Sequence, residues 1–149
     1  FLKTYFTKTC LLPSPRQTPY RGGFSAVEHN NLSNYDFAID LQYFHDGKNA
    51  GTSPTAIQFL RSIITLCEKK KIELILVTTP VHPEYFSRIP NNFKIAFEKL
   101  RSELVDEGIT CLDYSQLSLT DDQFSDSNHV NGSGAREIST LVNQRIKQP

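Results

Sequence analysis

Apolar residues recur at helical spacing in the part of the chain that follows residue 53. Ser53 precedes Pro54, and this pair is typical of the start of an α-helix. Beyond it, every third or fourth position is apolar: Ile57, Leu60, Ile64 and Cys67. This period predicts an amphipathic helix over 54–70. A similar apolar stripe predicts a second helix over 92–107, and Gly108 is suited to end it.

Two short apolar segments alternate with the helices. Residues 72–78 are apolar at both odd and even positions, which is typical of a strand buried on both faces of a parallel sheet. Residues 109–114 form a second expected strand, and a polar loop over 115–130 leads to a last helix over 132–146. This alternation predicts an α/β fold with a small parallel sheet. Two or three strands are few for an independent α/β domain, so we expect the full sheet to need more chain than this.

The N-terminal part of the chain has no such period. Prolines, glycines and paired asparagines interrupt residues 1–35, and the segment after them fits either a short helix or a strand, closed by a turn at Asp46-Gly47. We therefore divide the chain into an irregular N-terminal segment over 1–53, packing on the core, and an α/β portion over 54–149. The chain begins with Phe1 and has no methionine, which indicates a processed protein or a piece of a longer one.

Composition limits the kind of protein. The chain has 149 residues, with 16 Lys and Arg against 16 Asp and Glu, so its formal net charge is zero. This balance argues against a nucleic-acid partner and against a polybasic membrane surface. No apolar run approaches the ~20 residues of a membrane span, and no signal peptide is recognisable. We expect a single globular domain.

The cysteines and most of the histidines give no metal pattern. Cys10, Cys67 and Cys111 show neither C-x-x-C nor Cys/His spacing. Cys67 and Cys111 fall in a predicted helix and strand, where a buried free thiol is favoured over a redox or nucleophilic role. His29 and His45 are expected at the surface. We expect no metal and no cofactor.

The most specific motif is Asp126-Ser-Asn-His129, in a loop that precedes the last helix. At this spacing the carboxylate of Asp126 can accept from Nδ1–H of His129, which leaves Nε2 free to take a proton from a hydroxyl nucleophile. Asn131 is placed to cap the following helix. The alternative is a polar surface loop with an incidental histidine, because Asp-x-x-His is a common pattern.

The chain from about 54 to 147 resembles the C-terminal end of SGNH/GDSL-type hydrolases, in the branch associated with cell-envelope acyl transfer and esterase chemistry. The resemblance is carried by the apolar strand ending in Thr-Thr-Pro-Val-His-Pro, by Leu112-Asp113-Tyr114-Ser115, and by the block from Phe124 to Ala135. It implies a three-layer α/β/α fold in which His129 is the general base and Asp126 its orienting carboxylate. It also implies glycan or other ester-bearing substrates and a cell-envelope or extracytoplasmic location, with no cofactor.

The chain departs from that family's pattern at the nucleophile. It contains no Gly-Asp-Ser block, and the nearest counterpart, Gly23-Phe24-Ser25, is not preceded by an apolar strand. The block that supplies an oxyanion-binding Asn has only Gly47-Lys48-Asn49-Ala50 as a counterpart. The resemblance therefore predicts the base-bearing part of a serine esterase or acyl transferase that is inactive by itself.

Two other hypotheses stay open at this point. The chain could be a non-catalytic binding or interaction domain that keeps the scaffold without the nucleophile, or an α/β domain with no small-molecule site. His82, just after the first strand, is placed where a substrate contact could form, although an ordinary loop histidine is the favoured alternative.

Overall fold

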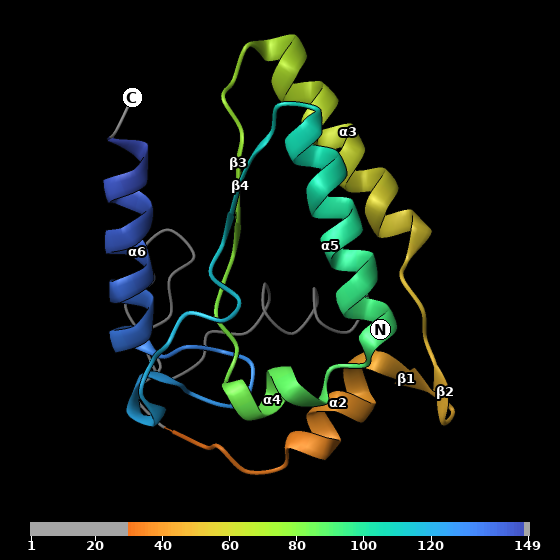
Figure 1. Cartoon of the computed structure of the whole chain (residues 1–149), viewed down its shortest axis with the longest axis vertical. Helices are drawn as coiled ribbons and strands as arrows, with labels where there is room; N and C mark the ends of the chain where they lie inside the picture. The colour runs from red at the N-terminus through yellow and green to blue at the C-terminus, as the bar shows by residue number, and fades with distance from the viewer. Residues whose placement is uncertain (1–29, 148–149) are drawn as a thin grey trace, which may run out of the picture.

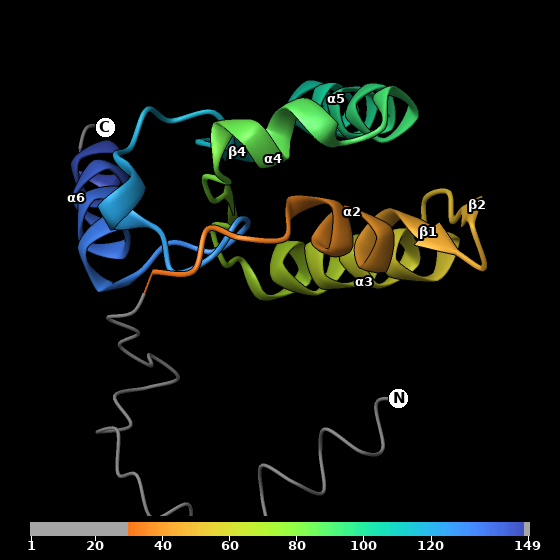
Figure 2. The same ribbon diagram turned by 90° about the horizontal axis from the view of Figure 1, so that it is seen from below.

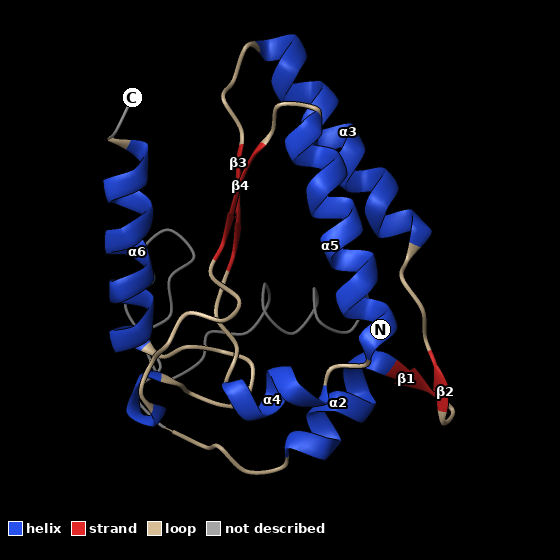
Figure 3. Cartoon of the chain, in the orientation of Figure 1, coloured by secondary structure: helices blue, strands red, loops and turns tan. Residues whose placement is uncertain are grey.

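The computed structural model describes residues 30–147. In chain order (Figures 1 and 3), the elements are α2 (Tyr35–Tyr43), β1 (Phe44–His45), β2 (Lys48–Asn49), α3 (Pro54–Lys70), β3 (Ile75–Thr78), α4 (Pro83–Arg88), α5 (Asn91–Asp106), β4 (Thr110–Asp113), the 3-10 helix η1 (Asp121–Gln123) and α6 (Gly132–Ile146). The expectations for residues 1–29, including Ser25, His29 and Cys10, lie outside the described part.

A parallel pair of strands organises the molecule. β3 and β4 are in register from Ile75 opposite Thr110 to Thr78 opposite Asp113. In the views of Figures 1 and 2, α6 lies on one side of this pair and α3 and α5 on the other. The predicted α/β class with a parallel sheet is thus confirmed at this coarse level. Because the strands run the same way, the segments after Thr78 and Asp113 leave from one end of the sheet, where Tyr114 N–H donates to the Thr78 carbonyl at 3.0 Å.

The predicted helix over 54–70 is present with the predicted start. The Ser53 hydroxyl accepts the N–H of Ala56, Pro54 occupies the first turn, and Ile64 is buried on the inner side. Arg61 on its polar side forms ion pairs with Glu103 of α5 and with Glu107, which caps the end of α5. The apolar face and the N-cap at Ser53 therefore both stabilise this helix.

The first strand is shorter and more exposed than its sequence predicts. It spans Ile75–Thr78, whereas Ile72 lies before it and is 57% exposed, and Val77 within it is 39% exposed. The expectation of a strand buried on both faces is wrong here. β3 has one hydrogen-bonded neighbour among the described strands, so the apolar run has less cover than in the middle of a wide parallel sheet.

A short helix, α4, occupies a stretch for which the sequence predicted no helix or strand. Pro83 stands in its first turn, and the His82 ring accepts the N–H of Glu84 as the cap. Proline stops the preceding strand but suits the first turn of a helix, so the same residue ends one element and begins the next. Tyr85 of α4 is 1% exposed, which makes α4 part of the core.

The described part of the N-terminal segment forms one of the two elements that its sequence allows. The segment that fitted helix or strand is helix α2, and Asp46 and Gly47, both with positive φ, form the predicted turn between β1 and β2. α2 packs on α4, where Tyr85 hydrogen-bonds Gln42 and Arg88 pairs with Asp36. The division of the chain at residue 53 stays a prediction.

The helices of the described chain give one further limit. Between residues 30 and 147, no helix combines the length and the apolar character needed to cross a membrane.

Candidate functional site

The structure brings together the two residues that the motif singled out. His129 Nδ1 lies 2.9 Å from Oδ1 and 3.0 Å from Oδ2 of Asp126. The carboxylate can only accept, so Nδ1 carries the proton of the neutral ring and Nε2 has a free lone pair. The predicted geometry of a His–Asp pair is present, and the unprotonated nitrogen faces away from the carboxylate.

The backbone holds Asp126 in this position. Its Oδ1 also accepts the N–H of Asn128 at 3.0 Å and the N–H of His129 at 2.8 Å. A side chain that accepts from the backbone two and three residues ahead stabilises a tight local turn. The carboxylate is therefore tied to the segment that carries its imidazole partner.

Both ends of this segment are anchored to its neighbours. We call residues 120–131 the dyad loop. Ser125 N–H donates to the carbonyl of His129 at 2.9 Å, which closes the loop on itself. Asn131 caps α6 as predicted, its side chain accepting the N–H groups of Ser133 and Gly134. The segment before α2 also contacts the loop, because Asn31 N–H donates to the Ser125 carbonyl at 2.8 Å.

The dyad is open to solvent. The side chain of His129 is 67% exposed and that of Asp126 is 45% exposed. Within residues 30–147, no hydroxyl forms a hydrogen bond with Nε2 of His129. A base with an accessible nitrogen can take a proton from a hydroxyl that approaches from elsewhere.

His82 lies beside the dyad loop, and the sequence did not predict its contacts. Its backbone N–H donates to the Ser127 carbonyl at 3.0 Å. Its ring lies 3.2 Å from Asp121 and 3.3 Å from the Tyr35 hydroxyl, and packs edge-on against Phe124. The side chain is 13% exposed, so most of the imidazole is covered by these neighbours. Tyr35 and Asp121 are far from His82 in sequence, and no local pattern links them to it.

Asn49 does not join the dyad. It lies in β2, where its side chain exchanges hydrogen bonds with Asn92 and accepts the N–H of Gly51. Figures 1 and 2 both place β2 at the opposite end of the molecule from α6. The sequence-based suggestion of Asn49 as an oxyanion donor is therefore wrong within this structure.

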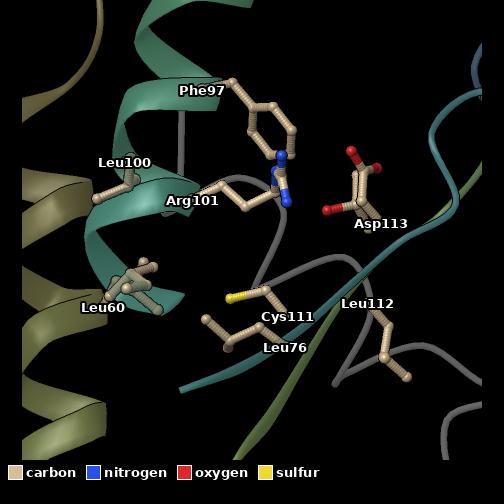
Figure 4. A pocket seen from close by; sticks show the side chains of 10 residues that line it. Leu60, Leu76, Phe97, Leu100, Arg101, Cys111, Leu112 and Asp113 are labelled. Carbon is tan, nitrogen blue, oxygen red and sulfur yellow. The ribbon is translucent and has the colours of Figure 1, made fainter. Parts of the chain in front are cut away.

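A small apolar pocket of about 100 Å³ lies between α5 and the two parallel strands (Figure 4). Phe97 and Leu100 line it from α5, and Arg101 points across it toward Asp113 at the end of β4. Cys111 also lines it, and burial raises the pKa of its thiol. A raised pKa disfavours the thiolate, which agrees with the expected inert role of this cysteine. The pocket does not include the dyad.

No cluster of three His, Cys, Asp or Glu side chains with metal-binding geometry occurs among residues 30–147. Each histidine in this part of the chain contacts at most one carboxylate. Nε2 of His45, for example, lies 3.6 Å from Oδ2 of Asp46.

A model of one uncharacterised protein family matches residues 47–149, a span that includes the parallel strands and the dyad. No curated protein and no solved structure matches the chain.

Proposed function

We propose that this chain, which belongs to that uncharacterised family, is the base-bearing part of an SGNH-like serine esterase or acyl transferase. His129 would be the general base and Asp126 its orienting carboxylate. The observation that carries the proposal is the contact of 2.9 Å between Nδ1 of His129 and Oδ1 of Asp126, in a chain whose sequence resembles that family around both residues.

The chemistry follows from the protonation of the ring. Nε2 of His129 takes the proton of a serine hydroxyl as its oxygen attacks the carbonyl carbon of an ester. Asp126 stabilises the imidazolium that results. The imidazolium then returns the proton to the departing alkoxide, which leaves an acyl-serine. Water gives hydrolysis in the second half, and the hydroxyl of an acceptor gives acyl transfer, with His129 again removing the proton.

The position of the dyad in the fold supports this role. The dyad loop follows β4 and directly precedes α6, and the end of a parallel strand is where α/β proteins bind ligands. Helices lie on both sides of the β3–β4 pair, which fits the three-layer fold that the resemblance implies. The resemblance also suggests glycan or other envelope esters as substrates, without a cofactor. A similar fold does not by itself establish an activity, so the experiment must test the residues of the site.

A nucleophile from outside residues 30–147 is part of the proposal. Ser25 lies in that outside part of this chain, and a Gly-Asp-Ser block in a longer gene product is the other source. The absence of a hydroxyl on Nε2 of His129 among the described residues also favours a second candidate, a binding domain that retains the dyad without a nucleophile.

Two variants decide between these functions. We would measure hydrolysis of p-nitrophenyl acetate, and labelling by a fluorophosphonate probe, for the 149-residue chain and for the full gene product that contains it. His129→Ala should abolish both signals wherever they occur. His45→Ala is the matched control, because His45 is also exposed and beside an aspartate, and it should leave both unchanged. Equal loss in the two variants, or no signal in either protein, would overturn the esterase and favour the binding domain.

A further inference from the structure

We infer that His82 is a positioning residue that holds the dyad loop, and through it the Asp126–His129 pair, in its observed geometry. Its importance for a reaction rests on the proposed function, whereas its hold on the loop can be tested without any activity.

Both ring nitrogens of His82 are engaged. Nδ1 lies 3.2 Å from the N–H of Glu84 and can only accept there, so the neutral ring carries its proton on Nε2. Nε2 lies 3.2 Å from Oδ1 of Asp121, to which it donates. The hydroxyl of Tyr35 lies 3.3 Å from the same nitrogen, whose single lone pair it shares with the Glu84 N–H. The ring thus bridges the start of α4 and the start of the dyad loop.

Three contacts of this one residue bracket Asp126. Asp121 lies ahead of it in the loop, and Phe124, which is 0% exposed, packs edge-on against the imidazole with ring centroids 5.2 Å apart. Beyond Asp126, the carbonyl of Ser127 accepts the backbone N–H of His82 at 3.0 Å. The loop is therefore fixed to the start of α4 on both sides of the carboxylate.

The two histidines have opposite tautomers for physical reasons. His129 carries its proton on Nδ1 because of Asp126, and His82 carries it on Nε2 because of the Glu84 N–H. A free histidine in water has no such constraint, so a loosened loop would let His129 lose its Nδ1–H preference. The tautomer of His129 thus reports whether the loop keeps Asp126 in contact with the imidazole.

The experiment is a long-range ¹H–¹⁵N NMR spectrum of ¹⁵N-histidine-labelled 149-residue chain, above the pH where the rings protonate. In the unmodified chain we expect His129 to show the Nδ1–H tautomer. In His82→Ala we expect a mixture of both tautomers. In His82→Gln, whose amide nitrogen can reach Asp121, we expect the Nδ1–H tautomer to be restored. Asp121→Ala, which removes an exposed side chain, gives a second break of the same contact if His82→Ala fails to fold.

An unchanged His129 tautomer in a folded His82→Ala or Asp121→Ala variant would overturn the positioning role. Where the gene product hydrolyses p-nitrophenyl acetate, His82→Ala should also lower kcat about 10-fold or more with KM within about twofold, because small misplacements of a catalytic group are costly. A lower kcat at unchanged KM, with the His129 tautomer also unchanged, would overturn positioning through the loop. A tautomer change in a protein with no esterase activity supports positioning and overturns only the proposed function.

Discussion

The carbonyl oxygen of Gln123 lies so close to Gly134 that a Cβ added to this glycine would come within 2.5 Å of it. The same Cβ would lie 2.9 Å from the Cβ of Val130. The first turn of α6 therefore packs directly on the dyad loop, and only the absence of a side chain permits it. We predict that Gly134→Ala lowers the free energy of unfolding by about 1–3 kcal/mol, because backbone and a short side chain must both move.

Gly132→Ala is the control for this prediction. A Cβ at Gly132 meets nothing within 4 Å, and alanine in a helix is favoured over glycine by roughly 0.5–1 kcal/mol. Urea unfolding should show Gly132→Ala as equal to or more stable than the unmodified chain. If both variants are equally stable, the close contact at Gly134 does not hold α6 on the loop.

Asp126 should matter for the loop as well as for the imidazole. Its Oδ1 accepts two backbone N–H groups, so Asp126→Ala leaves both without this partner and should cost about 1–2 kcal/mol of stability. Asp126→Asn keeps an oxygen for them and should lose less. His129→Ala removes a mostly exposed ring and should change stability by less than about 0.5 kcal/mol. Thermal unfolding of the three variants checks this order, and a larger loss in His129→Ala than in Asp126→Ala would contradict it.

The local part of this site could be predicted from the sequence, and the distant part could not. Asp126 and His129 are three residues apart, and Asn131 caps the helix that follows at once, so spacing alone placed all three. His82 contacts Asp121 and Tyr35 across 39 and 47 positions of sequence. Such contacts depend on how β3, α2 and the dyad loop pack, which no periodicity in one segment encodes.

The dependence on distant neighbours also explains which predictions about the fold were wrong. The helix period and the caps at Ser53 and Asn131 depend on neighbours within one turn, and they were predicted correctly. The burial of Val77 depends on which strands lie beside β3, and the apolar run gave no information about that. Helix α4 has no counterpart among the sequence-based predictions, because a proline such as Pro83 ends a strand as readily as it begins a helix.

Tyr85 makes stability sensitive to alkali. Burial raises the pKa of Tyr85 well above its ordinary value of 10.0, and the neighbouring Tyr43 and Asp126 add to the shift. Because the folded state holds this proton more tightly than the unfolded state, the stabilisation is complete below pH 10 and is lost as the pH rises above it. We predict that the free energy of unfolding falls by about 1 kcal/mol between pH 9 and pH 11 through this group.

The variant Tyr85→Phe tests the alkaline loss. It removes the ionisable group and the hydrogen bond to Gln42, so the protein should be less stable at pH 8 but lose less stability between pH 9 and pH 11. Urea unfolding at several pH values measures both effects. Burial also raises the pKa of Tyr43, so part of the alkaline loss should remain in this variant. A slope identical to that of the unmodified chain would show that Tyr85 does not titrate in this way.

Two serines, one at the N-cap of α3 and one inside the helix, distinguish the effect of a cap from the effect of a serine within a helix. Ser53 lies at the start, and its hydroxyl accepts the otherwise unpaired N–H of Ala56 at 3.2 Å. Ser62 lies in the middle, where its hydroxyl donates to the Gln58 carbonyl, which is already part of the helix ladder. Ser53→Ala should therefore cost about 1 kcal/mol. Ser62→Ala should be neutral or slightly stabilising, because alanine has the higher helix propensity.

Chemical denaturation of the two variants under one set of conditions compares these serines directly. The midpoint should fall for Ser53→Ala and stay level or rise for Ser62→Ala, with the same slope against denaturant in both. Hydrogen exchange at the amide of Ala56 should also become faster in Ser53→Ala alone, because this amide loses its partner. Equal midpoints and equal exchange would mean that the start of α3 is held by its ion pairs to α5 through Arg61 rather than by its cap.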